Sequence, residues 1–192
     1  MNLLIVNASP RHHGNIDKML QIIYDEAQKQ GAQTRFLRTD SLQAEPCKGC
    51  MACRKSLKCV LPDDGAQQFL ADIQWCDRIV IGAPCYWGNM PGHLKMLFDR
   101  IVYGMMGENE WGIPIPLHKG KKALIVSTCT TLWPLNLWFN QTKGVVKALH
   151  EILKYSGFKL IGTIQKAGTH RHKGLTARNI RQCRKKTRCL LR

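Results

Sequence analysis

Residues 1–16 read MNLLIVNASPRHHGNI, a short apolar run followed by a polar, basic loop that contains glycine. Residues 1–6 form the apolar run, and residues 7–15 form the loop. From Ile16 to Ala27 apolar residues recur every three or four positions, which is the spacing of a helix that buries one face. The stretch therefore predicts a strand, a tight loop and a helix that begins near Gly14 and Asn15.

The loop between this strand and helix has the features of an anion site. The first turn of a helix carries unpaired N–H groups and the positive end of the helix dipole. Ser9 adds a hydroxyl group, and Arg11 adds a planar charged fork suited to phosphate oxygens. Because several donors converge, phosphate fits better than a carboxylate. Many α/β domains also begin with a strand, a turn and a capped helix that bind nothing, so this alternative stays open.

Two familiar nucleotide motifs are absent from the sequence. It contains no G-x-x-x-x-G-K-[ST], which argues against a nucleoside triphosphatase. It also contains no G-x-G-x-x-G, which argues against an ordinary dinucleotide site.

The rest of the chain alternates between strand and helix signals. Further strands are predicted at residues 33–37, 78–83, 122–127 and 159–165, and helices at residues 15–30, 66–73, 92–103, 141–155 and 174–189. Five strands alternating with helices predict a parallel α/β sheet covered on both faces. With the anion loop after strand one, the economical topology is a flavodoxin-like three-layer sandwich of order 2-1-3-4-5. Its ligand lies outside the carboxyl ends of strands one and three.

Size and composition favour one domain, residues 1–192, with a cysteine-rich loop at residues 40–64 and a basic C-terminal helix at residues 173–192. At 44% hydrophobic residues the chain can build one sizeable core. No segment approaches the roughly 20 apolar residues needed to span a bilayer, and the opening run is shorter than a signal-peptide core. We therefore expect a soluble, cytoplasmic protein with no membrane partner and with reduced cysteines.

Two further loops are expected to meet the first at one crevice. Residues 84–90 (PCYWGNM) combine aromatic planes, a glycine that permits close approach and backbone donors. Residues 128–131 (TCTT) add hydroxyl and N–H groups. This mixture suits a flat heteroaromatic ring on a phosphorylated polyol chain, as in FMN. Tyr86 and Trp87 could instead be core aromatics, although neighbours in an extended chain cannot both point inward.

NASPRHHGN (7–15) and APCYWGNMPGHLKMLFDR (83–100) resemble the loops of the NAD(P)H-dependent FMN reductase group of flavodoxin-like proteins, and the likeness extends to about residue 165. The resemblance implies an oxidoreductase that takes electrons from NAD(P)H through FMN to a second acceptor, either a small molecule or a protein. It assigns Ser9, Arg11, Gly14 and Asn15 to the phosphate, and Pro84, Tyr86, Trp87, Asn89 and Met90 to the ribityl chain and ring. Ile16 stands where the group usually has Ser or Thr, so His12 or His13 could supply the missing contact.

The expected cofactor-binding set thus contains residues from all three loops. They are Ser9, Arg11, His12, His13, Gly14, Asn15, Ile16, Pro84, Cys85, Tyr86, Trp87, Gly88, Asn89, Met90, Thr128, Cys129, Thr130 and Thr131. No dedicated catalytic acid, base or nucleophile is expected, because the cofactor carries the chemistry.

Cys47, Cys50, Cys53 and Cys59 have the spacing C-x2-C-x2-C-x5-C. Three thiolates in seven residues can wrap one face of a cubane cluster, whereas structural zinc usually draws on two separated pairs. The spacing resembles the compact motif of the iron-sulfur flavoproteins, which are relatives within the same family. This resemblance implies a [4Fe–4S] cluster near the flavin, and an electron carrier that needs no nicotinamide as the alternative function. Free or redox-active thiols remain the other interpretation.

The net charge of +16 is concentrated at the end of the chain, where no Asp or Glu follows Glu151. Residues 178–188 carry a cationic stripe at helical spacing, which indicates a solvated outer face or a contact with phosphates. No aromatic residue is interleaved, so a nucleic-acid-binding protein is only a minor alternative. His170 and His172 are assigned to this tail.

Two further segments are expected to cover apolar surface or the crevice. Residues 133–139 are apolar and need a cover, either the flavin or a second copy in a homo-oligomer. Residues 104–116 are a candidate flap over the crevice.

Overall fold

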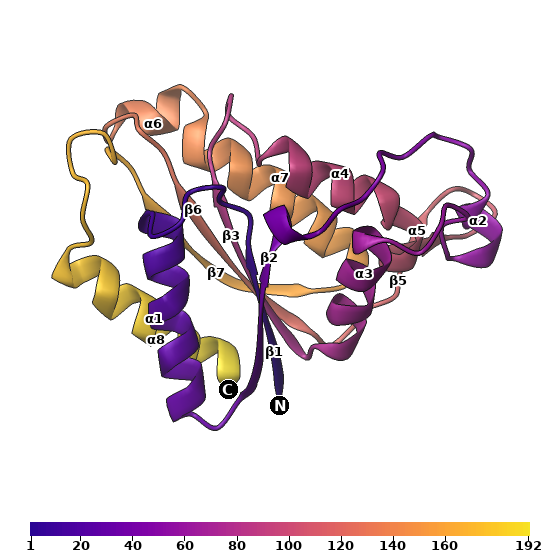
Figure 1. Cartoon of the computed structure of the whole chain (residues 1–192), viewed down its shortest axis with the longest axis horizontal. Helices are drawn as coiled ribbons and strands as arrows, with labels where there is room; N and C mark the ends of the chain where they lie inside the picture. Colours follow the sequence, from indigo (N-terminus) through magenta and orange to yellow (C-terminus); the bar gives the residue numbers. More distant parts are fainter.

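A five-stranded parallel sheet forms the centre of the protein (Figure 1). The computed structural model describes residues 1–192. The strands are β1 (Asn2–Asn7), β2 (Gln33–Arg38), β3 (Arg78–Pro84), β6 (Lys122–Thr128) and β7 (Lys159–Lys166). Their order is β2-β1-β3-β6-β7. This is the predicted order 2-1-3-4-5, because β4 and β5 lie outside this sheet, and the flavodoxin-like fold class is confirmed.

Helices cover both faces of the sheet, as Figure 1 shows. One face carries α1 (Asn15–Lys29) and α8 (Ala177–Leu191), which pack against each other. The other face carries α3 (Gly65–Trp75), α4 (Gly92–Arg100) and α7 (Gln141–Ser156).

The two faces of the sheet have separate cores. In β1, Leu4 and Val6 belong to the core under α3, α4 and α7, whereas Leu3 and Ile5 belong to the core under α1 and α8. Successive residues of a strand point to opposite faces. The continuous apolar run of β1 is therefore explained by burial on both sides.

Helix ends follow local sequence signals. Asp64 caps α3, and its Oδ1 accepts a hydrogen bond from the N–H of Ala66 at 2.9 Å. Gly157 ends α7 in the left-handed conformation, with φ of 95°. By contrast, no side chain caps the start of α1 at Gly14. No helix in the protein combines the length and the apolar character that a membrane crossing requires.

Several predicted boundaries are corrected. The helix expected at residues 92–103 ends at Arg100, and a separate turn, α5 (Val102–Met105), follows it. The cysteine-rich loop contains η1 (Thr39–Ser41) and α2 (Cys53–Ser56), and the long loop after β6 contains α6 (Leu135–Trp138).

The expected flap is a small antiparallel hairpin, β4 (Met106–Glu108) and β5 (Pro114–Pro116). It packs against α2, where Arg54 forms an ion pair with Glu108 at 3.3 Å. In Figure 1 this hairpin and α2 lie at the right-hand end of the molecule, away from α6. The hairpin therefore does not cover the crevice.

Candidate functional site

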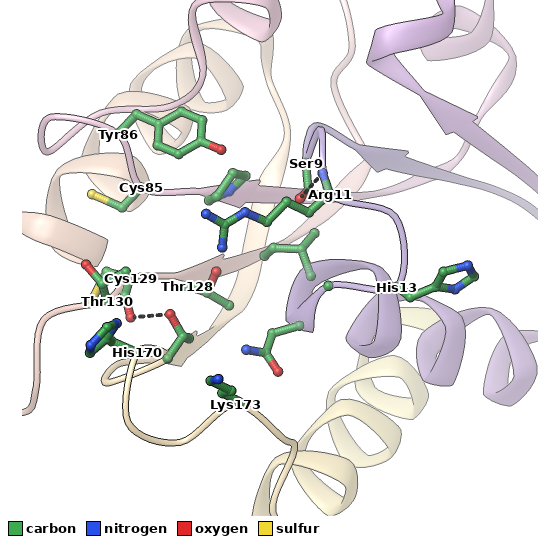
Figure 2. Close-up of a pocket in the computed structure, with 15 residues that line it drawn as sticks. Ser9, Arg11, His13, Cys85, Tyr86, Thr128, Cys129, Thr130, His170 and Lys173 are labelled. Atoms are coloured by element: carbon green, nitrogen blue, oxygen red, sulfur yellow. Dashed lines mark hydrogen bonds between the residues drawn. The ribbon is translucent and has the colours of Figure 1, made fainter.

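A pocket of about 380 Å³, hereafter the crevice, lies at the carboxyl ends of β1, β3 and β6 (Figure 2). The three predicted loops meet here, together with a fourth segment that follows β7. Its lining residues are Ser9, Arg11, His13, Gly14, Asn15, Ile16, Pro84, Cys85, Tyr86, Thr128, Cys129, Thr130, Thr169, His170 and Lys173. The volume is in the range of small-molecule sites, about 300–1,000 Å³.

The loop between β1 and α1 presents donors to one end of the crevice. Ser9 is buried, and its Oγ accepts a hydrogen bond from the N–H of Arg11 at 3.2 Å. The Arg11 side chain extends into the pocket in Figure 2. Because Gly14 has no side chain to cap α1, the first-turn N–H groups face the crevice without a side-chain partner. The Oδ1 of Asn15 is also buried there without a hydrogen-bond partner.

Arg38, at the end of β2, holds this loop in place through hydrogen bonds. Its Nη2 donates to the carbonyl of Ser9 at 2.9 Å, and its Nη1 donates to Oδ1 of Asp17 at 3.1 Å. Arg38 also hydrogen-bonds Asp40 and thereby lowers the pKa of that carboxyl. Sequence reasoning missed Arg38, because it is 29 positions from Ser9 and only the β1–β2 pairing brings the two together.

The second loop is a tight two-residue turn between Tyr86 and Asn89, whose backbones hydrogen-bond each other twice at 2.9 Å. Its central residues, Trp87 and Gly88, have φ of 52° and 71°. Two positive φ values are typical of a type I′ turn. Tyr86 therefore lines the crevice while Trp87 projects fully into solvent. The prediction that the two aromatics cannot both be buried is confirmed.

Gly144, in the first turns of α7, allows this helix to approach the tight turn. A Cβ at Gly144 would lie 1.8 Å from the carbonyl oxygen of Gly88. Any side chain at this position would therefore displace the turn that carries Tyr86. The sequence offered no signal for this role, because a single glycine near a helix start has many explanations.

The third loop brings Thr128, Cys129 and Thr130 to the crevice. Cys129 is buried, and its Sγ lies 3.4 Å from the carbonyl of Thr131. Cys85 is half-buried, and its Sγ lies 3.4 Å from Oε1 of Gln141. Burial raises the pKa of both thiols. Both are therefore protonated at neutral pH and are not nucleophilic thiolates.

The fourth segment, after β7, contributes Thr169, His170 and Lys173. Thr169 is fixed against the third loop, because its Oγ1 and its N–H both donate to the carbonyl of Cys129 at 3.1 Å. His170 lines the crevice, which corrects its assignment to the basic tail alone. The sequence missed these residues because their loop has no periodic pattern, and only the pairing of β7 with β6 brings it to the crevice.

Six residues of the expected cofactor-binding set do not line this pocket: His12, Trp87, Gly88, Asn89, Met90 and Thr131. Met90 is buried under the turn, and its N–H donates to Oδ1 of Asn89 at 2.8 Å. His12 faces Asp40, with 3.9 Å between Nε2 and Oδ2. Gly88 serves the geometry of the tight turn, as described above. Binding roles for these residues stay predictions.

The four spaced cysteines lie elsewhere, in the cysteine segment (residues 40–64). Cys47 and Cys50 are exposed, and Cys53 and Cys59 are half-buried. Burial raises the pKa of Cys53, and the nearby thiols of the other three raise it further. The four thiols therefore share one neighbourhood, but no three Cys, His, Asp or Glu side chains converge in a metal-binding arrangement. In Figure 1 this segment lies around α2, at the opposite end of the molecule from the loops after β1 and β6.

One side of the basic helix α8 packs against α1 and forms an ion pair with it. Arg188 Nε donates to Oε1 of the buried Glu26 on α1 at 2.5 Å, and this hydrogen bond lowers the pKa of Glu26. Arg181, Arg184 and Lys185 are exposed. The stripe is thus in part a structural contact and in part a solvated face.

Comparison with known proteins gives a consistent picture. A family described as having the flavodoxin-like fold matches residues 1–189. An iron-sulfur flavoprotein of Methanosarcina thermophila is 34% identical over 102 residues, which cover 53% of each chain. An iron-sulfur flavoprotein of Archaeoglobus fulgidus is 36% identical over 107 residues, which cover 56% of this chain and 52% of the relative. The chain spans about half the length of the curated relatives it matches.

Solved structures are similar over the whole chain. An azoreductase from Bacillus anthracis has a TM-score of 0.75 at 14% identity and covers 100% of this chain and 99% of its own. Flavodoxin 1 from Bacillus cereus has a TM-score of 0.66 at 15% identity, with 100% and 97% covered. At these identities the likeness establishes the shared fold.

Proposed function

The chain belongs to the flavodoxin-like family, and from this premise we propose that it is an FMN-binding oxidoreductase that takes electrons from NAD(P)H and passes them to a small-molecule or protein acceptor. The observation that carries the proposal is the convergence of four segments on one crevice at the carboxyl edge of the sheet. Open parallel sheets bind their ligands at this edge, where the strand order reverses. Here the reversal lies between β1 and β3.

The residues in the crevice fit FMN. The first turn of α1, the Ser9 hydroxyl and the Arg11 guanidinium offer donors for the phosphate group. The unpartnered Oδ1 of Asn15 offers an acceptor that a ribityl hydroxyl can satisfy. Tyr86 offers a flat apolar surface for the ring, and Thr128 and Thr130 offer polar groups for its edge.

The chemistry in this proposal comes from the cofactor, which when bound accepts hydride from a nicotinamide and gives up electrons to an acceptor. The protein binds and orients it. Arg38 holds the phosphate loop in place through Ser9 and Asp17. Burial raises the pKa of Cys85 and Cys129, so both pack beside the site as neutral thiols.

The test is to purify the full chain without oxygen, titrate it with FMN by calorimetry, and follow the oxidation of NADH and of NADPH at 340 nm. We expect one FMN per chain and nicotinamide oxidation when an acceptor such as a quinone is supplied. Absence of FMN binding would overturn the proposal. FMN binding without nicotinamide oxidation would leave the flavoprotein but remove NAD(P)H as donor.

The second candidate is an electron carrier of the iron-sulfur flavoprotein type, which needs no nicotinamide. It is favoured by the spaced cysteines and by relatives that bear this name. Four soft thiols with this spacing are the ligand type of a [4Fe–4S] cluster, which Cys47, Cys50, Cys53 and Cys59 would hold. The structure does not bring three of them together in a metal-binding arrangement, so the support comes from the spacing and from the relatives. Iron and sulfide assays on the anaerobic protein test it, with about four of each per chain expected.

We also propose that the chain forms a homo-oligomer. Trp133, Trp138 and Phe139, beside and within α6, are 75%, 77% and 61% exposed. So much aromatic surface on one loop is unusual for a monomer. Light scattering on the purified protein tests this, and a monomeric mass at micromolar concentration would contradict it.

A further inference from the structure

The segment that joins β7 to α8 brings a lysine to the crevice. Lys173 lines the same pocket as Gly14 and Asn15, at the start of α1. Figure 2 shows its side chain across the crevice from Ser9 and Arg11. Because α8 packs against α1, the part of the segment that leads into α8 lies on the α1 side of the crevice. Lys173 therefore reaches the end of the crevice where α1 begins.

Hydrogen bonds fix this segment before it reaches Lys173. The N–H of Gly168 donates to the carbonyl of Thr131 at 2.8 Å, next to the contact of Thr169 described above. The N–H of His172 then donates to the carbonyl of Gly168 at 2.9 Å and closes a turn. Lys173 thus follows directly on a turn that is held against the third loop.

The first loop lacks one hydroxyl group, and the two histidines that the sequence offered as its replacement are directed elsewhere. Ile16 is 2% exposed and packs in the core under α1 and α8. The ring of His12 faces Asp40. His13 lines the crevice, but Figure 2 shows its ring pointing away from Arg11. The missing contact therefore has to come from another segment.

The crevice carries positive charge that no acid in its wall balances. Its 15 lining residues include Arg11 and Lys173 but no Asp or Glu. Lys166, the register neighbour of the lining residue Thr128, adds a buried positive charge at the same edge of the sheet. A phosphate monoester carries about 1.5 to 2 negative charges at pH 7. Arg11 supplies one positive charge, so a second cation is needed to balance the phosphate.

We propose that the ammonium group of Lys173 binds the FMN phosphate from the side of α8 and, with Arg11, balances its charge. The inference rests on the FMN-binding function proposed above. It makes the segment after β7 a fourth cofactor-binding loop, which replaces the contact that Ile16 cannot make. Lysine binds phosphate as a compact point charge, and an exposed charge of this kind is screened by salt.

The experiment compares FMN with riboflavin, which has the same ring and ribityl chain but no phosphate. Calorimetry measures the Kd of each flavin for the full chain at low and at high salt. Lys173→Met keeps most of the side-chain stem and removes the charge. We expect its Kd for FMN to rise about tenfold at low salt and less at high salt. Its Kd for riboflavin should stay within about twofold of the wild-type value.

Two further variants serve as controls. Lys173→Arg keeps a cation at the same position and should retain most of the affinity for FMN. Arg171→Met removes a charge from an exposed residue of the same segment that does not line the pocket. It should keep the wild-type Kd for both flavins.

The outcomes separate this inference from the function on which it rests. An unchanged Kd for FMN in Lys173→Met would overturn the role of Lys173. An equal rise in Kd for FMN and riboflavin would also overturn it, because the loss would then not concern the phosphate. A wild-type chain that binds both flavins equally would remove the phosphate contact but leave flavin binding. A wild-type chain that binds neither flavin would overturn the proposed function and this inference with it.

Discussion

The crevice and the cysteine segment both carry residues suited to a cofactor, but they are held in different ways. The crevice lies on the ends of strands whose apolar residues, such as Ile5, Ile81 and Ile125, are fully buried. Cys47 and Cys50, by contrast, belong to a run of exposed residues, and the segment is anchored through Arg100 and Asp64 at its edges. The sheet therefore preforms the first region, whereas no strand holds the exposed cysteines of the second.

The largest expected effect tests whether the two regions are independent. Cys53→Ala removes one thiol from the middle of the cysteine segment. Iron in the reconstituted protein should fall from about four per chain to near zero, while the Kd for FMN stays within about twofold because the segment and the crevice lie apart (Figure 1). Iron analysis and calorimetry measure the two outcomes. Cys189→Ala, in α8, is the control and should keep both iron and FMN. Equal loss of iron and of FMN binding in Cys53→Ala would show that the two regions are coupled.

The reciprocal change is Arg11→Ala in the crevice. Loss of a charged hydrogen bond, about 1.5–3 kcal/mol, should weaken FMN binding about 10- to 150-fold. Iron content should stay at the wild-type level. Lys18→Ala removes an exposed cation from α1 outside the pocket and serves as control in the same calorimetric titration. Unchanged FMN affinity in Arg11→Ala would remove the phosphate assignment of this loop.

A third change tests how closely the crevice is packed. Gly144→Ala places a Cβ against the carbonyl of Gly88 and should lower the free energy of unfolding by about 1–3 kcal/mol. Urea denaturation measures it. Gly92→Ala, at the start of α4, meets no atom within 4 Å and should be neutral or slightly stabilising. If both variants unfold alike, the close approach of α7 to the tight turn is not a constraint.

The smallest effect concerns the packed helices α1 and α8, which Arg188 and Glu26 join. Arg188→Ala removes the partner that lowers the pKa of Glu26. A carboxyl with a lowered folded pKa contributes stability above its unfolded pKa, about 4.3, and loses it as the pH falls through the folded value. The difference in unfolding free energy between wild type and Arg188→Ala should therefore be largest at pH 7 and shrink below about pH 4.3.

Urea titrations at several pH values measure this difference. Arg181→Ala, on the exposed part of the same helix, is the control and should show no such pH dependence. A difference that stays constant between pH 7 and pH 3 would contradict the role assigned to the Arg188–Glu26 pair.

Much of the fold was predictable because its signals are local. The apolar run of residues 78–83 indicated a strand, and the periodic apolar residues of 66–73 indicated a helix. The position of the first loop and the alternation of elements were enough to predict the strand order. One boundary was wrong: the helix predicted to reach residue 103 ends at Arg100, because the backbone of Ile101 leaves the helical conformation with φ of −109° and ψ of 13°.

The sequence alone therefore determined the strands, the helices and the three loops, because each depends on residues close together in the chain. Their alternation and the position of the first loop then allowed the strand order to be predicted. It also determined the spacing of the four cysteines. Only the tertiary structure decided which residues support these features. Arg38, Gly144, His170 and Arg100 act on partners far from them in sequence or across separate elements, and such contacts leave no periodic or local mark.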